Sequence, residues 1–93
     1  MKPKLTLYSR QACGLCDEMK EVVRAVALKI PLEMEEIDVD RSNELRETFG
    51  NEVPVLFING RKAFKYRVTI KELEKRLMRR SPISWLGSRA GGA

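Results

Sequence analysis

The residues best suited to chemistry in this sequence are its two cysteines, Cys13 and Cys16, which are separated only by Gly14 and Leu15. An apolar run over 5–8 predicts a strand before them, and a helical pattern follows them. The first turn of a helix presents unpaired N–H groups and the positive end of the helix dipole, which stabilise a thiolate and lower its pKa. We therefore predict that Cys13 is the more exposed thiol, that Cys16 lies within its reach, and that the pair cycles between dithiol and disulfide.

Three other interpretations of this cysteine pair remain open. A structural disulfide is one, although so short a loop gives little entropic stabilisation. A zinc site needs four ligands, and one chain with two cysteines and no histidine supplies half of them. Two buried, inert thiols are the third. The spacing beside a strand–helix–strand pattern favours redox chemistry over all three.

The size of the chain predicts one small domain. Its 93 residues are 43% hydrophobic, which is enough for a single core. No stretch approaches the length of a membrane span, and Arg10 interrupts the first apolar run, so we expect no signal peptide. Two cysteines without a secretion signal predict a reducing compartment, and we expect a cytoplasmic location.

The net charge of +5 is distributed unevenly along the chain. Residues 1–60 carry 8 basic and 11 acidic groups, whereas residues 61–93 carry 10 basic and 2 acidic groups. A basic region of this kind can bind nucleic acid or an anionic membrane. Because aromatic residues do not interleave with the basic ones, we expect a solvated surface and neither of these partners. An anionic thiol substrate would also be attracted to the positive electrostatic field of this basic region.

Hydrophobic periodicity and turn signals predict seven elements around the cysteines. In chain order these are a strand over 4–8, a helix over 14–29, a strand over 32–39, a helix over 43–49, a strand over 52–58, a strand over 61–66 and a helix over 70–80. Asn59-Gly60 predicts a type I′ turn between the last two strands. Thr69 and Glu72 form a capping box before the last helix.

Apolar residues at helical spacing predict the buried face of each helix. In the first helix these residues are Leu15, Met19, Val22, Val23 and Val26. In the last helix they are Ile70, Leu73 and Leu77, with Met78 beside them. In the short helix Leu45 and Phe49 are expected to face inward, with Ser42 as the N-cap and Gly50 as the C′ residue.

This order of elements, β-α-β-α-β-β-α, predicts an α/β domain over residues 1–80. A helical crossover makes the first two strands parallel, and the hairpin adds antiparallel strands. We therefore expect a mixed four-stranded sheet with helices on both faces. Residues 81–93 are predicted to be a flexible tail, in which Trp85 and its apolar neighbours can dock on the domain or contact a partner.

The pattern resembles a glutaredoxin, the compact form of the thioredoxin fold, over about residues 4–80. The segments that carry the resemblance are 7–16, Glu36-Ile37-Asp38-Val39-Asp40, Val53-Pro54-Val55 and Asn59-Gly60. A first strand that begins at residue 4 fits a glutaredoxin better than a thioredoxin. The sequence motif Cys-x-Leu-Cys-Asp is most similar to the motif of a divergent glutaredoxin-like family.

The resemblance implies a thiol–disulfide oxidoreductase in which Cys13 is the nucleophile and Cys16 the resolving thiol. Arg10 would lie near the thiolate and a glutathione carboxylate. The backbone of Val53 would pair with substrate beside a cis Pro54. No bound cofactor is expected; the external reductant would be glutathione or a reductase, and the substrate a protein disulfide or a small thiol. We expect a monomer.

Two segments depart from the glutaredoxin pattern. Gly14 and Leu15, which would border the substrate, replace the usual Pro-Tyr. The Gly-Gly-x-Asp signature that holds the γ-glutamyl end of glutathione is replaced by Tyr-Arg-Val-Thr over 66–69. The resemblance therefore implies weak binding of glutathione.

Two other classes of function are also open. In one, two chains pool Cys13 and Cys16 into four thiolate ligands for a metal or an iron–sulfur cluster. In the other, the chain is a non-enzymatic adaptor that keeps the fold and uses its basic C-terminal surface.

Overall fold

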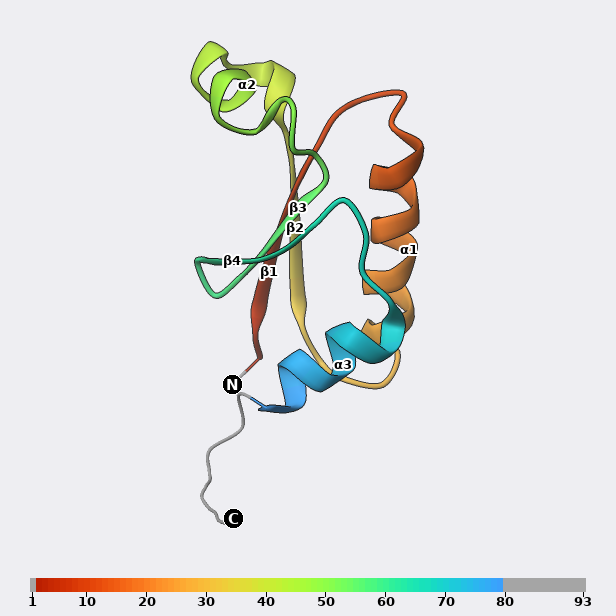
Figure 1. Ribbon diagram of the computed structural model, residues 1–93. Coiled ribbons are helices and arrows are strands. Elements are labelled where there is room, and N and C mark those ends of the chain that lie inside the picture. Colours follow the sequence, from red (N-terminus) through yellow and green to blue (C-terminus); the bar gives the residue numbers. More distant parts are fainter. Residues whose placement is uncertain (1, 80–93) are drawn as a thin grey trace.

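The computed structural model describes residues 2–79, and Figure 1 shows the order of its elements. They are β1 (Lys4–Ser9), α1 (Gly14–Ala27), β2 (Glu33–Asp38), the 3₁₀ turn η1 (Val39–Arg41), α2 (Asn43–Phe49), β3 (Val55–Ile58), β4 (Arg61–Lys65) and α3 (Ile70–Arg79). This order confirms the predicted β-α-β-α-β-β-α arrangement. The strand predicted over 52–58 begins only at Val55. The reason is that Pro54 has no N–H to donate to a neighbouring strand.

The four strands form one mixed sheet in the order β2-β1-β3-β4. β1 runs parallel to β2 and antiparallel to β3, and β4 returns antiparallel beside β3. The turn between β3 and β4 has positive φ angles at Asn59 (50°) and Gly60 (83°), as a type I′ turn requires. The acidic strand β2 lies at an edge of the sheet.

The main core lies between the sheet and the helices α1 and α3, which cover the same face (Figure 1). Its fully buried side chains come from alternate positions of β1 and β3 and from one stripe of each helix: Leu5, Leu7, Leu56, Ile58, Met19, Val23, Val26 and Leu73. On the opposite face Phe49 of α2 stacks on Tyr8, with ring centroids 4.5 Å apart. Helices therefore cover both faces, as predicted.

The buried stripes of α1 and α3 differ in part from the predicted ones. In α1 the inward residue of the first turn is Cys16, whereas Leu15 is only half-buried. In α3 Ile70 is 44% exposed and Met78 is 67% exposed. Met78 lies about 100° around the helix axis from Leu77, whereas Ile70 shares the face of Leu73 and Leu77 but is the first residue of the helix. Val68, just before the helix, packs into the core instead.

Gly50 also differs from its prediction. It is the C-cap of α2, with right-handed φ and ψ angles of −55° and −32°, and does not need a left-handed conformation. A Cβ at this position would collide with the carbonyl oxygen of Arg46, which accepts the Gly50 N–H at 2.8 Å. The glycine is thus required by close approach of the backbone.

The predicted flexible tail over 81–93, with Trp85, lies outside the described residues. Within residues 2–79 none of the helices combines the length and the apolar character that crossing a membrane requires.

Candidate functional site

The cysteine pair lies at the start of α1, where the sequence predicted it. Cys13 is the N-cap and Cys16 belongs to the first turn, and the two side chains form a disulfide with a Cα–Cα distance of 5.2 Å. The Sγ atom of Cys13 also accepts a hydrogen bond from the backbone N–H of Cys16 at 3.1 Å. The sulfur therefore occupies the place where a capping oxygen satisfies an unpaired N–H group.

The two cysteines differ sharply in their access to solvent. Cys16 is 1% exposed, whereas Cys13 is only half-buried. A reagent that approaches from solvent therefore meets the sulfur of Cys13 first. Between them Gly14 is exposed and Leu15 is half-buried.

The loop between β1 and α1 is held in shape by an unusual backbone angle at one residue. Ala12, directly before Cys13, has a φ angle of 55°, in the left-handed region that few non-glycine residues adopt. This turn directs the chain from the end of β1 into the first turn of α1.

Arg10 begins the same loop, but its guanidinium group binds the protein itself. Nε and Nη2 donate to the two carboxylate oxygens of Asp40 at 3.2 and 3.0 Å, and Nη1 donates to the Gly50 carbonyl at 3.3 Å. These bonds join the loop to η1 and to the end of α2. Binding of a thiolate or a glutathione carboxylate by Arg10 stays a prediction, and it would require this side chain to exchange partners.

The Val53–Pro54 peptide bond is cis, as the resemblance implied. Because β3 is antiparallel to β1, with Tyr8 opposite Val55, the residues before β3 lie at the end of the sheet where the cysteine loop begins. The carbonyl of Pro54 accepts the Tyr66 N–H at 2.8 Å. Among residues 2–79 no backbone hydrogen bond of Val53 is present, and the residue is half-buried.

In the segment over 66–69, which corresponds to the place where glutaredoxins hold glutathione, three residues already contact other parts of the protein. The Thr69 hydroxyl accepts the Glu72 N–H at 3.0 Å, and the Glu72 carboxylate accepts the Thr69 N–H at 2.9 Å, which confirms the capping box. Arg67 pairs with Glu18 of α1 at 3.7 Å, and both side chains are well exposed. Val68 is buried in the core.

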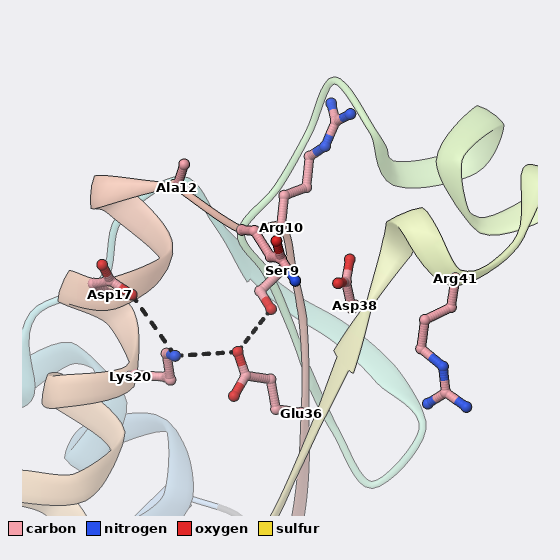
Figure 2. A pocket seen from close by; sticks show the side chains of 9 residues that line it. Ser9, Arg10, Ala12, Asp17, Lys20, Glu36, Asp38 and Arg41 are labelled. Atoms are coloured by element: carbon pink, nitrogen blue, oxygen red, sulfur yellow. Dashed lines mark hydrogen bonds and ion pairs between the residues drawn. The ribbon is translucent and has the colours of Figure 1, made fainter.

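A polar pocket of about 350 Å³ opens beside the cysteine loop, at the carboxyl ends of β1 and β2 (Figure 2). The residues that line it are Ser9, Arg10, Gln11, Ala12, Asp17, Lys20, Glu36, Asp38 and Arg41. Three of them form a chain of contacts across the pocket. The buried Ser9 hydroxyl donates to Oε2 of Glu36 at 2.8 Å, and the Lys20 ammonium lies 3.2 Å from the same oxygen.

These contacts change the acidity of Glu36. The hydrogen bond from Ser9, followed by the hydrogen bond and charge of Lys20, holds the pKa of this carboxyl below its usual value, although partial burial opposes them. Sequence reasoning missed the network. The available signal was Ser9 itself, a polar residue at the inward-facing position that continues the alternation of Leu5 and Leu7.

Comparison with known proteins agrees with this geometry. Residues 4–78 match the model of a family described as Glutaredoxin-like domain (DUF836). The Glutaredoxin-like protein YDR286C homolog of Dictyostelium discoideum is 34% identical over 70 residues, which are 69% of this chain and 65% of that protein. The chain thus matches slightly less than two thirds of that relative's length.

Solved structures share the fold, and two of them illustrate the likeness. Protein XcR50 from X. campestris is 28% identical and superposes with a TM-score of 0.71, covering 84% of this chain and 99% of that one. A mutant thioredoxin from Halobacterium salinarum is 21% identical, with a TM-score of 0.65 over 89% of this chain and 78% of its own. The likeness to thioredoxin shows the fold alone.

Proposed function

The chain belongs to the glutaredoxin-like domain family, and from this premise we propose that it is a thiol–disulfide oxidoreductase that reacts through Cys13 and Cys16. The observation that carries the proposal is the disulfide between an accessible and a buried cysteine at the start of α1. This unequal exposure supports Cys13 as the nucleophile and Cys16 as the resolving thiol.

In the first step the Cys13 thiolate attacks one sulfur of a substrate disulfide. A bond forms between Cys13 Sγ and that sulfur, the substrate S–S bond breaks, and the other substrate sulfur leaves as a thiolate. The Cys16 N–H, which lies 3.1 Å from Cys13 Sγ, is placed to stabilise the attacking thiolate, together with the positive end of the α1 dipole.

In the second step the Cys16 thiolate attacks Cys13 Sγ in the mixed disulfide. The Cys13–Cys16 bond forms, and the remaining substrate sulfur leaves as a second thiolate. The substrate has gained two electrons and the protein has lost two. An external thiol reductant then returns two electrons to the Cys13–Cys16 disulfide, so that no bound cofactor is required.

The backbone of Val53 is the proposed docking site for the substrate chain. Its N–H and C=O groups are free of partners within the described residues and lie at the same end of the sheet as the cysteine loop. An extended segment of a substrate protein can pair with them as an added strand does. Gly14 and Leu15 would border this segment and leave room for a bulky partner.

Glutathione is a poor candidate for the substrate that this site prefers. At the position of the γ-glutamyl group, Thr69 is committed to its capping box and Val68 is buried. Arg67 is the one cation there that can meet a carboxylate, and it is paired with Glu18. We therefore favour a protein disulfide as the substrate and a reductase as the source of electrons.

A coupled reduction assay tests the proposal. The protein is given a disulfide substrate such as insulin, with electrons supplied once by glutathione and glutathione reductase and once by thioredoxin reductase. The expected result is turnover that requires Cys13 and is faster with thioredoxin reductase. A Cys13→Ser variant as active as the wild type with both reductants would overturn the proposal.

A further inference from the structure

Lys20 lies on the same face of α1 as both cysteines. Cys13, Cys16 and Lys20 are spaced three and four residues apart, which places side chains above one another on one side of a helix. Side chains four apart on a helix are neighbours, with about 5–6 Å between their Cβ atoms. The Lys20 ammonium also shares the pocket in Figure 2 with Ala12 and Asp17, which adjoin Cys13 and Cys16 in the sequence. Lys20 is therefore a cation one helical turn from Cys16 and two turns from Cys13.

The charge of Lys20 is shielded mainly by one carboxylate. Its side chain is 24% exposed, and its ammonium lies 3.2 Å from Oε2 of Glu36 and 3.7 Å from Oδ1 of Asp17. Asp17 is 74% exposed, so solvent weakens its effect. Glu36 is less exposed and belongs to a neighbouring strand, so the short Lys20–Glu36 contact depends on the tertiary fold.

Glu36 is fixed in this position by the strand beside it. Ser9 is 3% exposed, and its hydroxyl donates to the same Oε2 atom that Lys20 contacts. This hydrogen bond and the charge of Lys20 lower the pKa of Glu36, so that it carries a negative charge at neutral pH. Arg24, one turn further along α1, adds a weaker attraction.

We propose that the Lys20–Glu36 pair sets how easily the Cys13–Cys16 disulfide is reduced, with Lys20 favouring the reduced form and Glu36 limiting that effect. The inference rests on the proposed function, because it assigns a role to the pair in the reaction of that disulfide. Ser9 acts through Glu36 as a positioning residue.

The direction of each effect follows from the charges of the two redox states. The disulfide is neutral, whereas reduction by two electrons yields a dithiol of which a fraction is ionised to thiolate. A nearby positive charge stabilises the thiolate and thereby the reduced form, and a nearby negative charge does the opposite. A more stable reduced form means a higher reduction potential. Lys20 and Glu36 therefore shift the potential in opposite directions.

The test is a redox titration of the purified full chain against dithiothreitol buffers at pH 7, with alkylation and mass spectrometry to count free thiols. Glu36→Gln is expected to shift the equilibrium constant about threefold toward the dithiol, which is ~15 mV. Lys20→Gln is expected to shift it by a similar factor toward the disulfide. The Lys20→Gln/Glu36→Gln double variant should return close to the wild type.

Lys4 and Glu35 provide a matched control. They pair at 3.5 Å between β1 and β2, with Lys4 at the end of β1 away from the cysteine loop, and Glu35 is adjacent to Glu36 but on the other side of the strand. Lys4→Gln and Glu35→Gln change the net charge by the same amounts and should leave the potential unchanged. Lys20→Arg keeps the charge and should also keep the potential.

Three results would overturn the proposal. Shifts of the same sign in Lys20→Gln and Glu36→Gln would indicate a structural effect. Equal shifts in the controls would indicate net charge alone. Loss of the wild-type potential in Lys20→Arg would show that charge is not the cause. Because dithiothreitol replaces any biological substrate, the titration gives its answer even if the chain proves to have no oxidoreductase activity.

Discussion

The Sγ atom of Cys13 accepts a hydrogen bond from the backbone N–H of Cys16, at 3.1 Å, while the two side chains are joined in a disulfide. The contact depends on Cys13 being the N-cap of α1, and it brings a helix N–H group to the sulfur that solvent can reach. The chemistry proposed for this pair follows from that arrangement.

The first prediction concerns the order in which the cysteines react. In the reduced protein Cys13 should be alkylated by iodoacetamide at least tenfold faster than Cys16, because Cys16 is 1% exposed and Cys13 is half-buried at the helix start. Peptide mass spectrometry after short exposures measures both rates. Faster labelling of Cys16 would mean that the two roles have been assigned the wrong way round.

The second prediction concerns Ser9 and the pH dependence of stability. The lowered pKa of Glu36 means that its interactions contribute stability above the usual value of 4.5, and that this stability is lost as the pH falls through the lower value of the folded state. Ser9→Ala removes the hydrogen bond to the carboxylate and should reduce the free energy of unfolding by about 1 kcal/mol at pH 7.

Urea unfolding of the wild type and of Ser9→Ala, at pH 7 and at pH 3, measures this difference. The gap between the two proteins should narrow at pH 3, because the ionised fraction of Glu36 falls as the pH is lowered. A gap that is the same at both pH values would show that the ionised carboxylate is not the partner that matters.

The third prediction concerns Gly50, whose missing side chain allows close approach to Arg46. Gly50→Ala should lower the free energy of unfolding by about 1–3 kcal/mol, because the added Cβ collides with a backbone carbonyl that cannot move freely. Gly14→Ala is the matched control, since a Cβ there meets no atom within 4 Å. Equal stability of both variants in urea unfolding would contradict this account of α2.

The fourth prediction concerns glutathione. A Cys16→Ser variant, which cannot resolve a mixed disulfide, should react only weakly and reversibly at Cys13 with glutathione disulfide, forming a mixed disulfide and releasing one reduced glutathione. The reason is that Thr69 and Arg67, at the γ-glutamyl position, are already engaged with Glu72 and Glu18. We expect millimolar affinity at best, measured by mass spectrometry against glutathione concentration. A tight, saturable adduct would show that the site accommodates glutathione despite the lost glycines.

Local patterns predicted most of the fold. The order of the elements, the turn at Asn59-Gly60 and the capping box of Thr69 with Glu72 depend on residues close together in the sequence, and all three are confirmed. Ile70 was misplaced because helical spacing gives the face on which a residue lies but not whether the first turn of the helix is covered.

The side-chain partners at the site could not be predicted in this way. Arg10 binds Asp40 and the Gly50 carbonyl, which are 30 and 40 residues away, and Ser9 binds Glu36 across 27 residues. These pairs depend on the register of the parallel strands β1 and β2 and on where α2 ends. A single sequence does not encode either of them in a local pattern.

The most direct test of the central claim is a trapping experiment with a protein disulfide. The Cys16→Ser variant is incubated with oxidised insulin, and the products are separated without reductant and identified by mass spectrometry. The account predicts a covalent complex through Cys13 that disappears on reduction and does not form with Cys13→Ser. If Cys16→Ser formed no more covalent complex than Cys13→Ser, the chain would not act on disulfides through Cys13, and the proposed function would be wrong.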